Sequence, residues 1–234
     1  MGLKTDLETE VAAIFREQWQ TRDGEKVPAP EDLSLNSNDA VKLNATVLYA
    51  DMAASTDLVD QKKAPFAAEV YKAYLRCASR VVKDEGGTIT AYDGDRIMAV
   101  YIGNSKNTSA VRTALKINYA VHEIINPLMA KQYPKETYRL RQLVGVDTSE
   151  LWVARIGVRN DNDLVWVGRA ANYAAKLCSL NGKYRTYITA EVFDHMSQDV
   201  KVGGEDKKSM WDEMKWAARN NMRIYGSTWR WQIA

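Results

Sequence analysis

The chain is poor in two residue types, and each shortage narrows the chemistry open to it. Among its 234 residues are two cysteines, Cys77 and Cys178, and both fall in apolar helical patterns. We therefore expect buried free thiols rather than a disulfide. The two histidines, His122 and His195, have no companion Cys or His at metal-binding spacing, so a zinc site is not supported.

An excess of one charge and long apolar runs are missing as well. The 32 basic and 30 acidic residues leave a net charge of +2, which gives no reason to propose nucleic acid or an anionic membrane as a partner. The apolar runs fall far short of a membrane span, and the N-terminus lacks the apolar core of a signal peptide. We expect a soluble, cytoplasmic protein with one ordinary domain, or one domain with an appendage.

The N-terminal part predicts a helix and a linker. Residues 3–22 place their apolar side chains on one side of an amphipathic helix, namely Leu3, Leu7, Val11, Ile14, Phe15 and Trp19. This stripe must be buried on its own domain or on a second copy. Residues 23–40 favour a loop, because they are rich in Pro, Gly, Asn, Asp and Ser. We therefore divide the chain into a helix and linker, 1–40, and a domain, 41–234.

The stretch from Thr46 to Thr56 contains the first candidate functional residues. It begins apolar and β-prone and ends in small polar residues, which predicts a buried strand entering a turn. Asp51 lies at the end of that strand, and Ser55 or Thr56 can cap a following helix whose first N–H groups would seat a phosphate. A carboxylate repels a phosphate, so this arrangement predicts a divalent cation between them. The alternative is a helix start with one exposed Asp.

A second acidic position follows at a predicted hairpin. Thr88–Tyr92 and Arg96–Ile102 have strand character, and Asp93-Gly94 between them is a strong signal for a two-residue turn. Asp95 therefore lies at the edge of a tight hairpin. Taken alone, this segment fits a plain polar turn, but the order strand–Asp, helix, strand–turn–Asp–strand is specific.

The remaining pattern alternates helices and strands. Helices are expected at 57–85, where Pro65 stands near a start or marks a break, and at 106–130 and 172–180. Strands are expected at 138–147, 151–158, 163–168 and 186–189. The tail, 207–234, is expected to hold a last hairpin around Gly226 and four tryptophans that serve packing, Trp211, Trp216, Trp229 and Trp231.

Four segments in this order resemble the catalytic domain of class III nucleotidyl cyclases. They are Asp51 with Ser55-Thr56, the pair Gly94-Asp95, the strand and turn Leu143–Ser149, and the segment Leu164–Lys176. The resemblance implies an α/β (α+β) fold of the ferredoxin-like type. A central, mostly antiparallel sheet would carry helices packed on it, with the N-terminal helix added.

The same resemblance implies a two-metal site. Asp51 and Asp95 stand where the family has its metal-binding aspartates, and the carbonyl of Met52 would complete a shell of hard oxygen ligands that suits Mg²⁺ or Mn²⁺. Two such ions, about 3.5–4 Å apart, activate a ribose 3′-hydroxyl and neutralise the leaving diphosphate. Such chemistry needs no catalytic His or Ser triad.

A second group of residues is implied to act on the transition state. Asn172 stands in the place of the family's ribose-orienting Asn, and Lys176 in the place of its Arg. The bidentate guanidinium of Arg is thereby replaced by the single ammonium charge of Lys. Arg169 or Arg155 could take over part of the role of the family's Arg. In the family the metal aspartates and the Asn/Arg pair of one site come from different subunits. A homodimer with sites at the subunit interface is therefore implied.

The predicted nucleotide-binding positions depart from those of purine cyclases. The family's base-reading positions are Ala91 and Val165 in this chain, and both are apolar. A site that lacks the polar side chains that hydrogen-bond a purine base binds purines weakly, so ATP and GTP are disfavoured. Tyr49 adds bulk and Arg96 adds a donor, which favours a pyrimidine. The other predicted nucleotide-binding positions are Ser55, Thr56 and Arg169.

In these features the chain resembles the compact pyrimidine cyclases of bacterial Pycsar anti-phage defence. We expect conversion of UTP to 3′,5′-cyclic UMP and diphosphate, because an Arg donor suits O4 of uracil better than the N4 amino group of cytosine. The resemblance further implies that the product activates a separate effector in abortive infection. The alternatives are a cytidylate cyclase, a divergent adenylyl cyclase and a non-catalytic cyclase-like binding module.

Overall fold

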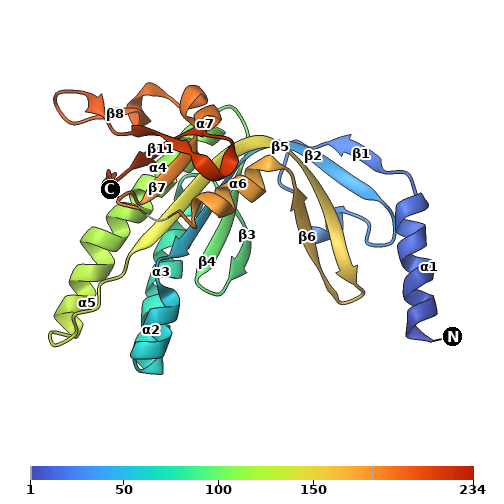
Figure 1. Ribbon diagram of the computed structural model, residues 1–234, viewed down its shortest axis with the longest axis horizontal. Helices are drawn as coiled ribbons and strands as arrows, with labels where there is room; N and C mark the ends of the chain where they lie inside the picture. The colour runs from blue at the N-terminus through green and yellow to red at the C-terminus, as the bar shows by residue number, and fades with distance from the viewer. Residues whose placement is uncertain (1, 181) are drawn as a thin grey trace. The chain divides into compact units, whose positions relative to one another are not determined.

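The computed structural model describes residues 2–180 and 182–234, in two compact units (Figure 1). The smaller unit comprises the chain up to Asn44 and the segment Glu150–Gly168, and the larger comprises Ala45–Ser149 and Arg169–Ala234. The sequence-based division at residue 41 stays a prediction. In the described part of the chain, no helix has both the length and the apolar character needed to cross a bilayer.

The larger unit is built on a mostly antiparallel sheet, as expected. Its strands follow the order β10-β11-β7-β5-β2-β4-β3. β5 and β7 pair in parallel, whereas β2–β4, β3–β4, β7–β11 and β10–β11 pair antiparallel. The strands are β2 (Asp39–Met52), β3 (Thr88–Asp93), β4 (Arg96–Tyr101), β5 (Gln142–Val158), β7 (Thr186–Thr189), β10 (Asp212–Trp216) and β11 (Met222–Ser227).

Helices occupy the connections between these strands. They are α2 (Ser55–Gln61), α3 (Ala64–Asp84), α4 (Lys106–Tyr119), the π-helical η2 (Ala120–Ile125), α5 (Asn126–Gln132), α6 (Arg169–Leu177), α7 (Ala190–His195) and the 3₁₀ turns η3 (Gln198–Val200) and η4 (Ala217–Arg219). Two short strands, β8 (Val202–Gly203) and β9 (Lys208–Ser209), pair separately. Pro65 lies in the first turn of α3, where its missing N–H leaves no bond unmade, and it does mark a break.

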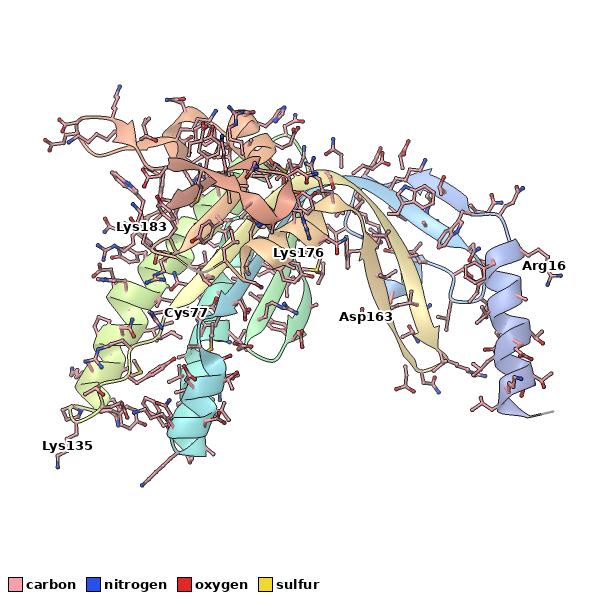
Figure 2. All side chains as sticks on the ribbon, in the orientation of Figure 1. Arg16, Cys77, Lys135, Asp163, Lys176 and Lys183 are labelled. Atoms are coloured by element: carbon pink, nitrogen blue, oxygen red, sulfur yellow. The ribbon has the colours of Figure 1, made fainter. Side chains whose placement is uncertain are left out.

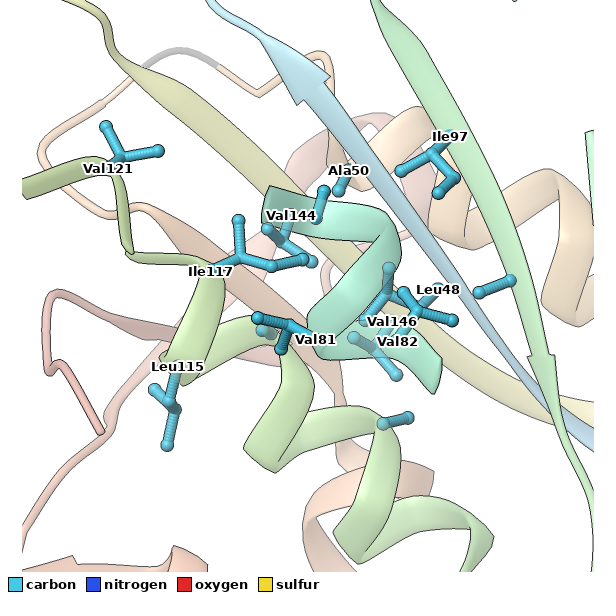
Figure 3. Packing of buried hydrophobic residues seen from close by; sticks show 14 of the residues in the cluster. Leu48, Ala50, Val81, Val82, Ile97, Leu115, Ile117, Val121, Val144 and Val146 are labelled. Atoms are coloured by element: carbon cyan, nitrogen blue, oxygen red, sulfur yellow. The ribbon is translucent and has the colours of Figure 1, made fainter. Parts of the chain in front are cut away.

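The main core lies between the sheet and helices α3 and α4. Figure 3 shows side chains from β2, β5 and both helices gathered there. The labelled members are Leu48, Ala50, Val81, Val82, Ile97, Leu115, Ile117, Val121, Val144 and Val146, and each is buried. Removing such side chains from water contributes about 1.5–3 kcal/mol for each Val, Leu or Ile.

Helix α6 lies on the opposite face of this sheet. Ile188 of β7 and Tyr225 of β11 belong to the main core, whereas their neighbours Tyr187 and Ile224 form a second cluster with Leu177 of α6. Because successive side chains of a strand point to opposite faces, α6 covers the face away from α3 and α4.

The smaller unit contains α1 (Leu3–Arg16), β1 (Gln20–Asp23), η1 (Pro30–Asp32), the start of β2, the end of β5 and β6 (Asp161–Val167). β1 runs parallel to β2 with Gln20 opposite Asp39, and β5 and β6 form an antiparallel hairpin. No residue of α1 is buried. The apolar stripe of α1 is thus exposed, with Leu3 at 75% and Phe15 at 85%.

The predicted helix 3–22 and the predicted break in β5 were wrong. The helix ends at Arg16, and Trp19 precedes β1 and packs edge-on against Trp152 with ring centroids 6.0 Å apart. The segments expected as strands 138–147 and 151–158 belong to one strand, Gln142–Val158, because no Gly or Pro interrupts the ladder between them. The expected loop 23–40 likewise contains η1, and β2 begins at Asp39.

The predicted position of the last hairpin, in the tail of the chain, was also wrong. Gly226 lies inside β11 and not in a turn, and an added Cβ there would be 2.6 Å from the ring of Tyr184. The turn falls at Asn220 and Asn221, which take positive φ angles of 51° and 56°. Asn tolerates this conformation, so glycine was a misleading signal. Trp211 and Trp216 are buried and Trp229 and Trp231 pack against the core, as predicted.

Candidate active site

Asp51 and Asp95 lie side by side although they are distant in the sequence. β2 and β4 pair with Ala50 opposite Ile97, so the end of β2 meets the β3–β4 turn. Burial raises the pKa of Asp51 to about 6, and the charge of Asp95 and a hydrogen bond with it act in the same direction. Arg96 and the N–H of Met52 oppose this rise. Two carboxyl groups that share a site repel each other in this way.

The pair suits a divalent cation. Two carboxylates supply hard oxygen ligands, and a cation between them would relieve the repulsion that raises the pKa of Asp51. Among the residues that the structure describes, no group of three or more His, Cys, Asp or Glu side chains could hold a metal ion. An ion at Asp51 and Asp95 would therefore complete its shell with carbonyls, water and substrate oxygens.

The turn after Asp51 differs from the expected helix cap. Helix α2 begins at Ser55, and its N-cap is Ala54 in the left-handed conformation, φ 57° and ψ 40°. Ser55 and Thr56 are therefore the first helical residues, and the prediction that either caps the helix is wrong. The N–H of Ala53 donates to the carbonyl of Arg141 at 2.8 Å, which fixes the turn.

Tyr49 and Ala91, two of the predicted base-binding positions, share one row of the sheet. Met98 of β4 lies opposite Tyr49 of β2 on one side and opposite Ala91 of β3 on the other. Directly opposed residues point to the same face. The guanidinium of Arg96 lies 5.3 Å from the ring centroid of Tyr49 and donates to Asp93 at 2.7 Å.

Cys178 lies behind Tyr49. Its thiol donates to the carbonyl of Tyr49 at 2.9 Å and accepts the N–H of Gly145 at 3.1 Å. Burial raises the pKa of this thiol, which keeps it protonated. Cys77 and Cys178 are both free, as predicted, but only Cys178 is buried, whereas Cys77 is half-buried.

Asn172 and Lys176 form a second group on helix α6. Both are exposed and stand one turn apart on the same face of the helix; Figure 2 shows Lys176 there. The buried face of α6 consists of Ala170, Ala171, Ala174 and Leu177. The helix begins at Arg169 rather than at Asn172 as expected.

Arg169 and Arg155, the predicted substitutes for the family's Arg, are both engaged. Nε of Arg169 donates to the buried carboxylate of Asp147 at 3.1 Å. Arg155 belongs to the smaller unit, where it donates to Asn162 at 2.8 Å and to the carbonyl of Leu33 at 3.3 Å. Sequence reasoning missed Asp147, although an acid directly after the apolar run 143–146 signals a buried partner.

Val165 lies in the smaller unit, where it pairs with Ala154 across the β5–β6 hairpin. It lines a cavity of about 960 Å³ together with residues of α1 and β5. The structure therefore brings Tyr49, Asp51, Ala91, Asp95 and Arg96 together in the larger unit and places Val165 in the other unit.

Comparison with curated proteins finds full-length relatives, although no family model matches the chain. The chain is 53% identical over 237 residues to a protein named uridylate cyclase from Burkholderia cepacia, and the alignment covers 100% of both chains. It is 48% identical over 233 residues to a protein of the same name from Xanthomonas perforans, again over 100% of both.

Solved structures share the fold. A bacterial light-regulated adenylyl cyclase matches with a TM-score of 0.69 at 17% identity, covering 82% of this chain and 55% of that chain. The adenylyl cyclase CyaB from P. aeruginosa matches with a TM-score of 0.67 at 19% identity, covering 80% of this chain and 95% of that chain. These likenesses confirm the predicted nucleotidyl cyclase fold.

Proposed function

We propose that this chain, which belongs to the uridylate cyclase family, converts UTP to 3′,5′-cyclic UMP and diphosphate. The observation that carries the proposal is the meeting of Asp51 and Asp95 at one point on a cyclase fold. Two adjacent carboxylates are the smallest protein scaffold that can hold two divalent cations.

In the proposed reaction, the ribose 3′-oxygen forms a bond to the α-phosphorus, and the bond from that phosphorus to the diphosphate oxygen breaks. Two bound Mg²⁺ or Mn²⁺ ions would lower the pKa of the 3′-hydroxyl, whose proton passes to water, and would neutralise the leaving group. Asp51, Asp95 and the carbonyl of Met52 are the residues that would hold them. With its pKa raised to about 6, Asp51 is mostly ionised at neutral pH, which is the form that binds a cation.

Charge that develops on the α-phosphoryl oxygens needs a fixed partner. We assign this role to Lys176 and the orientation of the ribose to Asn172. Their exposure on α6 supports this, because both side chains are open to a substrate held by another subunit. Ser55 and Thr56, at the first turn of α2, are the proposed contacts of the triphosphate.

The base is proposed to be uracil. Tyr49, Ala91 and Arg96 lie near the end of β2, and the guanidinium of Arg96 is held by Asp93 and by the ring of Tyr49. Nε of Arg96 is buried without a partner in the described residues, so a donor remains for a base carbonyl. The bulk of Tyr49 leaves less room for a purine. CTP is the second candidate.

A homodimer is proposed for the active form. Each site would then combine the aspartates of one copy with Asn172 and Lys176 of the other. Support comes from α1, whose apolar stripe is exposed, and from the apolar cavity of the same unit. Exposed apolar patches of this kind mark association surfaces. We further propose that the enzyme acts in the cytoplasm and that its product activates a separate effector in antiviral defence.

Product identity from an equimolar mixture of the four nucleoside triphosphates with Mn²⁺, measured by mass spectrometry, tests the proposal. We expect cyclic UMP as the main product of the wild type and none from Asp51→Asn or Asp95→Asn. Asp206→Asn is the matched control, because it removes a carboxylate that is 72% exposed and pairs with Lys208 on the surface. If cyclic CMP or cyclic AMP is the main product, the substrate is CTP or ATP instead of UTP. Retained turnover in either aspartate variant would contradict the proposal that Asp51 and Asp95 hold the metal ions.

A further inference from the structure

Asp147 of β5 is a buried acid that the proposed reaction does not use. Its side chain is 0% exposed. Nε of Arg169 donates to one carboxylate oxygen at 3.1 Å, and Nη2 of Arg169 and the hydroxyl of Thr189 donate to the other. Burial raises the pKa of Asp147, and these partners oppose that rise. A buried carboxylate is tolerated only when it is paired in this way.

Arg169 is also the first residue of helix α6. Its Nη2 donates to the carbonyl of Thr148 at 2.6 Å, so the guanidinium spans two consecutive residues of β5. The next strand residue takes part too, because Oγ of Ser149 accepts the N–H of Ala170 at 3.0 Å. The start of α6 is therefore tied to β5 at three successive positions.

The rest of α6 is held on the sheet by apolar packing. Its buried face is mainly alanine, and in the second half Leu177 joins the second cluster while Tyr173 packs edge-on against Trp216 with ring centroids 5.5 Å apart. Near its end, the helix passes so close to β5 that a Cβ on Gly145 would stand 2.1 Å from the carbonyl oxygen of Ala174. The contact at Gly145 holds the second half of the helix, and the pair Asp147–Arg169 holds the first.

We infer that Asp147 and Arg169 are positioning residues, which anchor α6 so that Asn172 and Lys176 reach the transition state. This inference rests on the proposed function. Asn172 and Lys176 lie three and seven residues after Arg169, on the same helical face, so a shift of the helix start moves both. Arg169 then acts through Asp147 rather than by touching the triphosphate.

Four variants test this role: Arg169→Gln, Arg169→Lys, Asp147→Asn and the double variant Asp147→Asn/Arg169→Gln. We expect Arg169→Gln to lower kcat with UTP and Mn²⁺ by about 100-fold with KM nearly unchanged, because misplacement by about 1 Å has that effect. Arg169→Lys should keep part of kcat, since it keeps the charge. The double variant should be more active than Arg169→Gln, because that single variant leaves the buried carboxylate of Asp147 without its charged partner.

Hydrogen exchange gives a second readout that does not depend on activity. Without nucleotide, the amides of α6 should exchange about tenfold faster in Arg169→Gln than in the wild type. Arg223→Gln is the matched control: it removes a half-exposed ion pair with Asp194, 3.2 Å long, and should change neither kcat nor exchange in α6. Arg169 is 42% exposed, so its variants remain testable if Asp147→Asn does not fold.

The inference is overturned if Arg169→Gln keeps kcat within about twofold, or if it raises KM at constant kcat, which would place Arg169 on the substrate. Unchanged exchange in α6 also overturns it. If the wild type makes no cyclic product from any nucleotide, the proposed function fails instead, and the exchange comparison still decides whether Arg169 anchors the helix.

Discussion

Replacing Asp51 by Asn should stabilise the protein at neutral pH while abolishing turnover. In the folded protein the pKa of Asp51 is raised from its usual 3.8 to about 6. A folded-state pKa above the unfolded one means that the folded state binds the proton more tightly. The stabilisation of the folded state by protonated Asp51 is complete below about pH 4 and is lost as pH rises through 6. At pH 7.5 the ionised carboxylate therefore lowers the free energy of unfolding.

The size of the effect follows from the pKa change. A rise of about two pH units corresponds to about 3 kcal/mol, and because Asp51 is partly exposed, solvent screening reduces this to about 1–2 kcal/mol. For a chain of this length, that raises Tm by about 3–6 °C. Asn keeps the shape and hydrogen-bonding capacity of the side chain, so little else should change.

The effect of Asp51→Asn on stability is measured by thermal unfolding of the wild type and the variant between pH 4 and 8, without divalent cations. The variant should have the higher Tm at pH 7.5, and the difference should shrink to about zero near pH 4. Asp206→Asn, which removes a surface carboxylate, is the control variant. Mn²⁺ should raise the Tm of the wild type at pH 7.5 more than that of Asp51→Asn. A variant that is less stable than the wild type at pH 7.5, or equally stabilised by Mn²⁺, would refute the reasoning.

Three further changes test other parts of the structure. Ala54→Gly should raise the free energy of unfolding by about 0.5–1 kcal/mol in urea, because Ala54 has φ 57° and glycine adopts that conformation without strain; a loss of stability would contradict the assigned turn. Gly145→Ala should lower the free energy of unfolding by about 2–3 kcal/mol and reduce kcat, since its Cβ would collide with Ala174; wild-type values in both assays would contradict the close packing of α6. Leu7→Lys with Phe15→Lys should shift the protein from dimer to monomer in size-exclusion chromatography with light scattering, and an unchanged dimer would show that α1 is not part of the interface.

Local chemistry made much of the larger unit predictable from the sequence. The Asp93-Gly94 turn specifies its hairpin through residues that are adjacent in the chain, and Pro65 specifies a helix start through its missing N–H. Asp51 at the end of an apolar strand was predictable for the same reason. Such features depend on a few neighbouring residues, so they can be predicted without knowledge of the rest of the fold.

Only the tertiary structure decided features that depend on residues far apart. The extents of the strands Gln142–Val158 and Gln20–Asp23 follow from which strands pair, which periodicity does not reveal. The exposure of α1 depends on what packs against the helix, which its amphipathic pattern does not reveal either. The raised pKa of Asp51 comes from its burial and from Asp95 beside it, and the charge of Asp147 needs Arg169 from another element. Burial and charge pairing are properties of three-dimensional neighbours, so the sequence alone could name the aspartates of the site but not the buried pair that holds helix α6.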